Sequence, residues 1–227
     1  MGVQPLSIES VGFQLTRVGK QTFIWRAIGA GERVLSALLL LLFLPLIVCA
    51  AVAVAILSRR APLIAHLRVG RQGHPIWVLK LRTMWKADAG GAWTISLVER
   101  LRTESPEIAL KTARDPRVTS RFAAICRKYS IDELPQLWHV VQGQMGLVGP
   151  RPLTVSEIQK HYGGAAACLL SVKPGISGLW QTKGRSRLTY NQRRRLDLFM
   201  IRKWSVGLYF RILGATVPSV LGGKNAW

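Results

Sequence analysis

Acidic residues are scarce in this 227-residue chain, which has 11 Asp and Glu against 32 Lys and Arg and a formal charge of +21. Its surface will therefore attract polyanions, which could be nucleic acid, an acidic membrane face or phosphorylated small molecules. Cysteine is scarce too. The three cysteines are an odd number without metal-type spacing, which argues against a disulfide framework and favours a reducing, cytosolic setting. Hydrophobic residues make up 49% of the chain, enough for a folded core.

Charge is absent altogether from residues 34–58, which read "VLSALLLLLFLPLIVCAAVAVAILS". An uncharged run of this length predicts a membrane segment. A cleaved signal peptide is disfavoured, because such a leader is short and this run begins only at residue 34. Two topologies stay open. One is a spanning helix, and the other is a kinked hairpin that enters and leaves one leaflet, since Pro45 lies near the middle of the run and basic residues flank both ends.

Apolar periodicity and turn residues predict the other elements. They are a β-hairpin at residues 63–84, helices at 94–104, 127–141 and 188–205, glycine- and proline-rich loops at 146–155 and 172–185, and an apolar segment at 206–221. The expected fold class is α+β and predominantly helical, with a membrane helix, a break and a second helix before a compact domain that holds a small β-hairpin. The expected divisions are a basic N-terminal segment (1–33), the membrane segment (34–58) and the compact domain (59–227), whose basic C-terminal helices are membrane-associated.

The stretch "SIDELPQLWHV" (130–140) holds the only adjacent carboxylates of the chain, Asp132 and Glu133. A structural role explains them: Ser130 and Glu133 match the S-x-x-E capping box, and Asp132 suits the positive end of a helix dipole. A chemical role is the alternative. It gains support from cationic residues in or beside turns, strand ends and prolines, namely Lys80, Arg82, Arg117, Arg127, Arg151 and Arg185.

Each of these cations alone could be a solvated surface charge. As a set around one carboxylate pair they suggest a site for a doubly phosphorylated ligand, because arginine holds phosphate through two parallel hydrogen bonds. Two carboxylates facing phosphates repel them unless a divalent cation lies between, and Mg²⁺ is the usual one. A carboxylate can also attack phosphorus directly and form an acyl phosphate.

Six motifs occur in a fixed order: "KLRTM" (80–84), "DPRVT" (115–119), "RKYSIDELPQL" (127–137), "GQMGLVGPRP" (143–152), "KPGISGLWQTKGR" (173–185) and the closing "GGKNAW". This pattern resembles the bacterial sugar transferase family, the monotopic phosphoglycosyl transferases that begin exopolysaccharide and O-antigen synthesis. The resemblance runs from about residue 30 to the last residue of the chain.

The resemblance implies a Mg²⁺-dependent enzyme that moves a sugar 1-phosphate from a UDP-sugar to undecaprenyl phosphate and releases UMP. Asp132 would be the nucleophile on the β-phosphorus, and Asp132 and Glu133 would form the Mg²⁺ site. The residues implied for the substrate phosphates are Lys80, Arg82, Arg127, Arg151 and Arg185. The stretch "GLWQ" (178–181) and the ending "GGKNAW" look most like the branch that transfers galactose or glucose.

The resemblance also bears on location. It implies that a helix broken at Pro45 enters only the cytoplasmic leaflet of the bacterial inner membrane, with the catalytic domain on the cytoplasmic face. Anionic lipid headgroups would then attract the excess Lys and Arg. Nucleic acid is not an expected partner, and the sequence indicates no particular oligomeric state.

Four positions depart from the family pattern. Ser36 stands where an acidic residue is frequent, Leu44 stands where a serine precedes the proline, Gln144 occupies an acidic position, and Tyr209 an aspartate position. None lies in the Asp-Glu pair, so we expect activity to survive, while packing or metal affinity could differ.

Two rival functions stay open. One is a membrane-tethered polyanion binder, suggested by the high pI and by the run of three arginines at 193–195. The other is an inactive scaffold for polysaccharide assembly, for which the four departures are the support.

Overall fold

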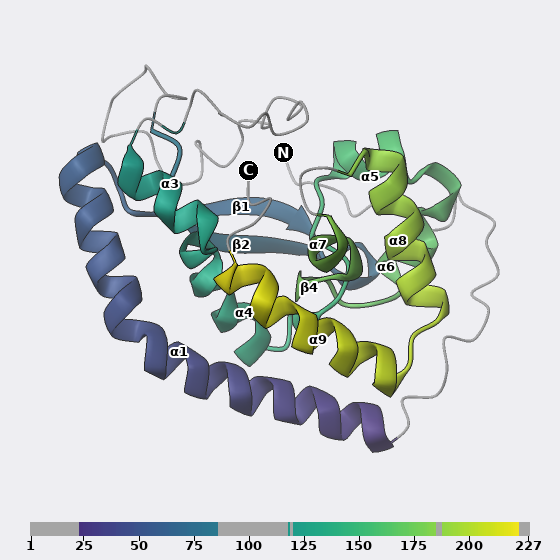
Figure 1. The fold of residues 1–227 in the computed structure, drawn as a ribbon. Helices are drawn as coiled ribbons and strands as arrows, with labels where there is room; N and C mark the ends of the chain where they lie inside the picture. Colours follow the sequence, from purple (N-terminus) through teal and green to yellow (C-terminus); the bar gives the residue numbers. More distant parts are fainter. Residues whose placement is uncertain (1–22, 86–117, 119, 185–187, 223–227) are drawn as a thin grey trace.

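A computed structural model describes residues 23–85, 118, 120–184 and 188–222. The fold is a mostly helical α+β arrangement with a long apolar N-terminal helix and two small sheets (Figure 1). The α-helices are α1 (Phe23–Ser58), α3 (Arg121–Lys128), α4 (Leu137–Val141), α5 (Val155–His161), α6 (Ala166–Leu170), α7 (Leu179–Lys183), α8 (Tyr190–Arg202) and α9 (Val206–Leu221). The 3-10 helices are η2 (Arg71–Gly73), η3 (Ile131–Gln136) and η4 (Gly163–Ala165), and the strands are β1 (Leu63–Val69), β2 (Pro75–Leu81), β3 (Gly146–Val148) and β4 (Gly175–Ser177). The helix expected at 94–104 lies outside the described residues.

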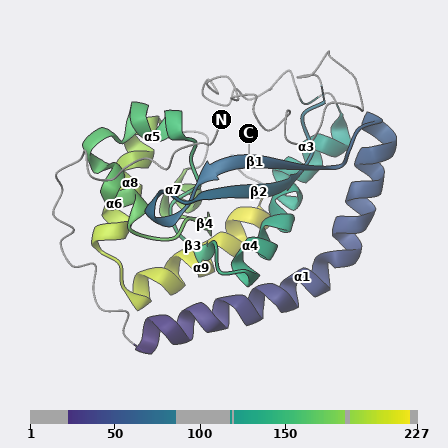
Figure 2. The ribbon, with the colours of Figure 1, turned by 180° about the vertical axis from the view of Figure 1, so that it is seen from behind.

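Helix α1 is one continuous helix of 36 residues and begins at Phe23, earlier than the uncharged run. By length and composition it could cross a membrane. Pro45 lies inside it, so the expected break into two separate half-helices is wrong. Proline lacks an N–H and crowds the carbonyl four residues earlier, which bends a helix that neighbouring packing holds together. In Figures 1 and 2 the helix bends near its middle and runs around one side of the domain.

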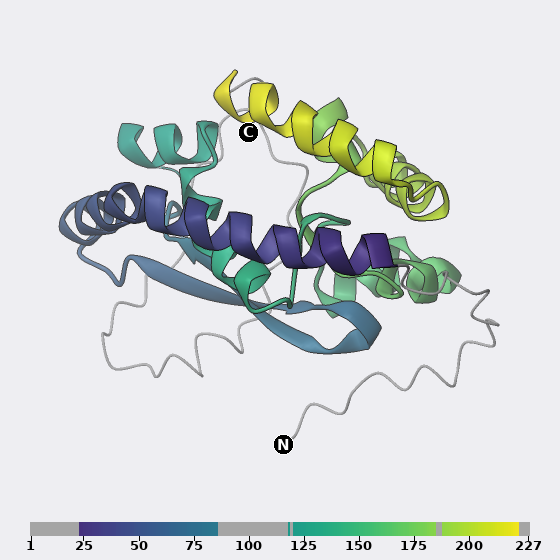
Figure 3. The ribbon, with the colours of Figure 1, turned by 90° about the horizontal axis from the view of Figure 1, so that it is seen from below.

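Much of the apolar surface of α1 is open. Leu41, Leu42 and Ile56 are each more than two thirds exposed, and many other apolar side chains of the helix are exposed as well. An apolar surface of this extent is typical of contact with a membrane or a partner. The inner side of the helix packs on the domain, and in Figure 3 α1 crosses the near face of the domain, with the β1–β2 hairpin to one side of it and α9 to the other.

Glu32 fastens the start of α1 to the domain. Its Oε1 accepts a hydrogen bond from the backbone N–H of Leu147 at 2.8 Å and another from the hydroxyl of Tyr209 at 2.9 Å. One carboxylate therefore joins α1 to β3 and α9. Nearby, the rings of Trp25, Trp204 and Tyr209 pack with centroids 5.8 to 6.4 Å apart.

The β-hairpin predicted at 63–84 is confirmed. Strands β1 and β2 pair antiparallel over seven residues each, and His66 lies opposite Val78. The turn needs left-handed backbone, which Gly73 supplies at a φ of 82°. Because paired residues share a face, the register decides which side chains look into the domain.

A second sheet was not predicted. Strands β3 and β4 pair in parallel, with Gly146 opposite Gly175 and Val148 opposite Ser177. They lie in the two segments predicted as loops, which also hold the starts of α5 and α7. The short parallel pair brings the two glycine-rich motifs together, so their side chains can serve one site.

Three apolar clusters fill the interior. One joins the end of β1 to α5, α6 and α8, a second joins the hairpin to α4 and β3, and a third joins β3 to α7, α8 and α9. The basic amphipathic helix predicted at 188–205 is confirmed as α8, and the apolar segment at 206–221 is α9. All three cysteines are free thiols, as expected.

Asp197 on α8 is a buried acid, 2% exposed. The hydroxyl of Tyr162 donates to its Oδ2 at 2.7 Å, while Oδ1 has no hydrogen-bond partner among the described residues. Burial raises the pKa of Asp197 to about 7, against the smaller lowering effects of Tyr162 and Arg193. The folded protein therefore keeps a proton that the unfolded chain releases above its ordinary pKa of 3.8.

We expect the stability of the protein to fall as pH rises from about 4 to 7, by up to about 1.4 kcal/mol per pH unit from this residue. Asp197 has a higher pKa in the folded state than in the unfolded state. Its contribution to stability is therefore complete below the unfolded-state pKa and is lost as pH rises through the folded-state pKa. Asp197→Asn, which keeps a neutral side chain, should flatten the profile. Thermal unfolding at pH 4.5 to 8 measures this, and an unchanged slope in the Asn variant would contradict it.

Candidate functional site

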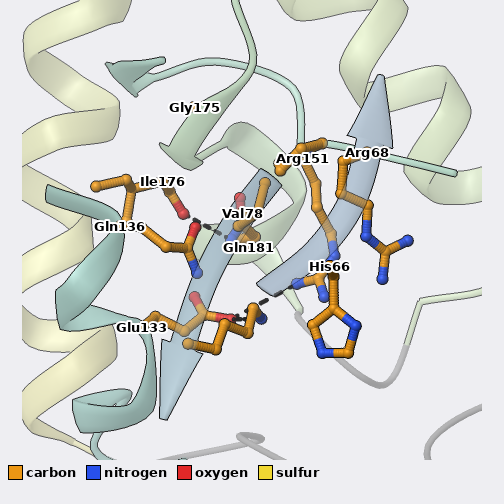
Figure 4. Close-up of a pocket in the computed structure, with 11 residues that line it drawn as sticks. His66, Arg68, Val78, Glu133, Gln136, Arg151, Gly175, Ile176 and Gln181 are labelled. Carbon is orange, nitrogen blue, oxygen red and sulfur yellow. Dashed lines mark hydrogen bonds and ion pairs between the residues drawn. The ribbon is translucent and has the colours of Figure 1, made fainter. Parts of the chain in front are cut away.

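An open pocket lies beside the acidic doublet. Its empty volume, including solvent at its mouth, is about 320 Å³. The lining residues come from the hairpin, from η3 and from both glycine-rich motifs: His66, Arg68, Val78, Lys80, Glu133, Gln136, Arg151, Pro152, Gly175, Ile176 and Gln181 (Figure 4). Three of the lining side chains are cationic and one is a carboxylate, so the pocket favours anionic ligands.

The hairpin supplies one wall through the alternation of strand side chains. His66 and Arg68 lie two residues apart on β1, and Val78 and Lys80 two apart on β2. His66 is paired with Val78, so these four side chains share one face of the hairpin. The sheet register therefore brings Lys80 of "KLRTM" to the same pocket as two residues that the motif does not include.

Glu133 is the anionic centre of the pocket. Lys80 donates from Nζ to Glu133 Oε1 at 2.7 Å, and Arg151 Nη1 lies 3.8 Å from the same oxygen. All three side chains are about one fifth to one quarter exposed. The predicted association of the doublet with Lys80 and Arg151 is therefore present, across 53 residues of sequence in the case of Lys80.

Asp132 lies next to this pocket but does not line it. Its side chain is buried, 8% exposed, in the first turn of η3. Consecutive residues of a 3-10 helix point about 120° apart, so Asp132 faces a different direction from Glu133. Burial first, and then the charge of Asp132, raise the pKa of the Cys126 thiol to about 11. Because Cys126 belongs to α3, this effect places the Asp132 carboxylate on the side of η3 that faces α3.

The expected capping box at Ser130 is wrong. Ser130 has a left-handed backbone, with φ 56° and ψ 26°, and its side chain caps nothing. A capping residue needs extended backbone so that its oxygen can reach the free N–H groups. Thr154 with Glu157, and Thr189 with Gln192, have that geometry and form the real capping boxes, of α5 and α8. Glu133 is thereby left to bind Lys80.

The other predicted phosphate ligands lie apart from the pocket lining. Arg82 is buried and donates from Nε to the carbonyl of Ala61 at 2.9 Å. Arg127 is buried on α3, and its Nε has no hydrogen-bond partner among the described residues. Arg117 and Arg185 lie outside the described residues.

Sequence reasoning missed four polar lining residues: His66, Arg68, Gln136 and Gln181. The signal for the first two was available, because residues at alternate positions of β1 had to share the face of Lys80. The two glutamines lie inside the quoted motifs "RKYSIDELPQL" and "KPGISGLWQTKGR", but the sequence analysis gave them no role. Gln181 is held by a hydrogen bond from its Nε2 to the carbonyl of Ile176 at 2.9 Å, a contact that depends on the unpredicted strand β4.

The acidic side chains near the pocket bear on metal binding. Among the described residues no group of three or more His, Cys, Asp and Glu side chains could hold an ion. Mg²⁺ does not need one, because it keeps several waters and binds one or two carboxylates together with substrate phosphates. Glu133, the carboxylate that lines the pocket, is of the type that meets this requirement, while Asp132 precedes it in the chain and faces α3.

The family described as bacterial sugar transferase matches residues 24–223. The chain belongs to the bacterial sugar transferase family. The match spans nearly all of α1, both small sheets and every residue that lines the pocket.

Three relatives illustrate the range of the family. The chain is 39% identical over 172 residues to a UDP-galactose-lipid carrier transferase of Erwinia amylovora, an alignment that covers 74% of this chain and 35% of that protein. It is 34% identical to the exopolysaccharide production protein ExoY of Rhizobium meliloti, covering 83% of this chain and 82% of ExoY. It is 36% identical to a UDP-glucose:undecaprenyl-phosphate glucose-1-phosphate transferase of Caulobacter vibrioides, covering 86% of this chain and 69% of that protein. The chain thus spans about a third of the length of the Erwinia relative.

Two of the departures from the family pattern have a structural explanation. Tyr209 donates its hydroxyl to Glu32, where an aspartate would set two carboxylates against each other. Gln144 accepts at Oε1 from His139 Nδ1 at 2.8 Å. Ser36 is fully buried without a hydrogen-bond partner for its Oγ among the described residues, and Leu44 is exposed.

His139 links α4 to the strand that carries Lys80. Its Nε2 accepts from the backbone N–H of Leu79 at 3.1 Å, so the imidazole is neutral and its proton is on Nδ1, facing Gln144. Gln144→Ala should therefore lower the free energy of unfolding by about 1 kcal/mol, because Nδ1–H loses its partner. Urea titration measures this. Gln142→Ala, at another exposed glutamine of the same turn, is the control, and equal effects of the two variants would refute the role of Gln144.

Proposed function

We propose that this chain transfers a sugar 1-phosphate from a UDP-sugar to undecaprenyl phosphate, giving undecaprenyl-diphosphate-sugar and UMP, as the first step of exopolysaccharide or O-antigen synthesis. The observation that carries the proposal is the pocket of a sugar transferase in which Glu133 contacts Lys80 and approaches Arg151, with Asp132 buried beside it. The names of the Erwinia and Caulobacter relatives support UDP-galactose or UDP-glucose as the donor.

The proposed reaction has two displacements. In the first, an oxygen of Asp132 bonds to the β-phosphorus, the bond from that phosphorus to the bridging oxygen breaks, and UMP leaves with that oxygen and its electron pair. In the second, an oxygen of undecaprenyl phosphate bonds to the same phosphorus, and the Asp132 carboxylate is released. Lys80 and Arg151 would move from Glu133 toward the substrate phosphates.

Glu133, with Asp132, would hold Mg²⁺. When bound, this ion neutralises charge on the diphosphate and makes the phosphorus easier to attack. Arg82 and Arg127 are both buried away from the pocket lining. They are therefore proposed to stabilise the negative charge of the buried Asp132 rather than to contact the nucleotide.

We further propose that α1 is re-entrant and holds the site at the cytoplasmic face of the inner membrane. A polyprenyl phosphate does not leave the bilayer and a nucleotide sugar does not enter it, so the catalyst must work at the interface. The exposed apolar surface of α1 and its bend support a shallow anchor, and the charge of +21 supports contact with anionic headgroups.

Incubation of the purified protein with labelled UDP-galactose or UDP-glucose, Mg²⁺ and undecaprenyl phosphate tests the activity. UMP and lipid-linked sugar should appear together. A panel of UDP-sugars identifies the donor. If no donor yields UMP, the enzyme proposal fails and the scaffold is favoured.

The topology is tested separately with single cysteines. Lys20→Cys and Pro62→Cys, each in a background whose three native cysteines are replaced by serine, should both react with an impermeant thiol reagent from the cytoplasmic side only. A re-entrant helix returns both of its ends to the same face. Reaction from opposite sides would show instead that α1 spans the membrane.

A further inference from the structure

The pocket has a second end, away from Glu133. Figure 4 shows Arg151 between Glu133 on one side and Arg68 and His66 on the other. His66 and Arg68 come from β1 and Arg151 from the segment after β3. Neither His66 nor Arg68 belongs to the motifs of the sequence analysis, and the reaction described so far gives them no task.

Arg68 is held rigidly at this end. Its Nη1 donates to Glu157 Oε2 at 2.8 Å, and the same oxygen accepts from the backbone N–H of Thr154 at 2.8 Å. The N–H of Val69 in turn donates to the carbonyl of Leu153 at 2.8 Å. The segment that follows Arg151 is thus tied to the end of β1, which keeps the two guanidinium groups near each other. Burial lowers the pKa of Arg68, Glu157 opposes this, and Arg151 is close enough for its charge to add a smaller lowering effect.

His66 completes this end as a neutral group. Burial first, and then the charges of Arg68, Lys80, Arg151 and Arg82, lower its pKa to about 4. The imidazole is therefore uncharged at neutral pH. No hydrogen bond joins it to another described residue, so it offers an N–H donor to a ligand without adding a further positive charge to a crowded group of cations.

Two guanidinium groups and a neutral donor match a phosphate monoester, which has two negative charges and three free oxygens. The geometry of phosphoryl transfer then says which phosphates can occupy the position. Attacking and leaving oxygens lie roughly in line through phosphorus. When UMP leaves the β-phosphorus opposite Asp132, the next nucleophile must also approach opposite Asp132. It therefore enters where the UMP phosphate has just been.

We propose that His66, Arg68 and Arg151 form one phosphate monoester subsite, which holds the phosphate of departing UMP and then the phosphate of the incoming undecaprenyl phosphate. The inference rests on the proposed function and deepens it. A single subsite used in turn explains how one small pocket serves a soluble product and a membrane-bound acceptor. It also makes the two ligands mutually exclusive.

Product inhibition tests the shared position directly. UMP should inhibit turnover competitively against undecaprenyl phosphate, with inhibition overcome by more lipid acceptor. Noncompetitive inhibition would show that the two phosphates bind at the same time and would overturn the inference.

Arg68→Gln tests the residues. Loss of one charge-assisted contact should raise both the inhibition constant of UMP and the KM for undecaprenyl phosphate about tenfold. Thermal unfolding of Arg68→Gln should change little, which a general folding defect would not allow. Arg202→Gln, at an exposed position of α8, removes the same charge and should leave both constants at their native values.

Two further variants keep the test decisive if Arg68→Gln folds poorly. Arg68→Lys retains the charge beside Glu157 but loses the planar fork, so both constants should still rise. His66→Phe should raise both constants a few-fold, while His66→Gln, which keeps a neutral donor, should restore them. A change in only one of the two constants, or in neither, would refute the subsite. Absence of UMP from the native protein would instead refute the proposed function.

Discussion

Asp132→Asn is expected to abolish the covalent phosphosugar adduct and the UMP released in a single turnover without lipid acceptor. The amide matches the carboxylate in size but is not a nucleophile, so turnover should fall by about 10³-fold or more. Asp132 is buried, and the isosteric change keeps its packing. Unaltered thermal unfolding would show that the loss is chemical.

Glu133→Gln is the informative comparison, because Glu133 and not Asp132 lines the pocket. This variant should need more Mg²⁺ for half-maximal activity but should still form the adduct when Mg²⁺ is raised. Mass spectrometry of peptides from protein incubated with UDP-sugar locates the phosphosugar. An adduct on Glu133, or normal turnover by Asp132→Asn, would assign the two carboxylates the other way round. A protein that only binds polyanions would keep its function in both variants.

Local patterns were sufficient for much of the fold. Alternation around Gly70 and Gly73 predicted the hairpin, and its register then placed Lys80 in the pocket. Helical periodicity predicted α8 and the apolar α9. These elements are long enough for their side-chain period to show in the sequence. The acidic doublet and Arg151 could be associated because both lie in distinctive motifs.

The features that were not predicted share a physical cause, because they depend on contacts between residues that are distant in sequence. Strands β3 and β4 have three residues each, too few to show a period. The bond between Arg68 and Glu157 joins residues 89 apart. Ser130 has the composition of a helix cap, yet the chain turns there with a left-handed backbone between α3 and η3, and composition does not encode that choice. A proline can end a helix, yet α1 continues through Pro45.

Trp138 shows the same limit within one helix. Within the helix predicted at 127–141, Leu134, Leu137 and Trp138 have the spacing of one apolar face, but the Trp138 side chain is 46% exposed, while Val140 is buried. The turn from η3 into α4 changes the helical period from three to 3.6 residues. An apolar face that is extrapolated from η3 into α4 therefore no longer points toward the core.

Gly149→Ala is expected to destabilise the protein by about 3 kcal/mol or more, because added volume at a site with no room forces backbone apart. A Cβ there would lie 2.6 Å from the backbone N of Gly175 and 2.6 Å from the carbonyl O of Lys173. Neither atom is the end of a flexible side chain. Strand β4 would have to move away, which breaks the bonds from Gly149 N to Ser177 O and from Gly175 N to Pro150 O, 2.8 and 2.9 Å long.

The consequence reaches the site, because Gly149 precedes Arg151 by two residues and Gly175 itself lines the pocket. The KM for the UDP-sugar should therefore rise together with the loss of stability. Gly214→Ala on α9 is the control, since a Cβ there meets nothing within 4 Å, and alanine in a helix should add about 0.5 to 1 kcal/mol. Urea titration of both variants measures the contrast. If Gly149→Ala unfolds at the same urea concentration as Gly214→Ala, the close approach of the two glycine-rich motifs does not hold the pocket together.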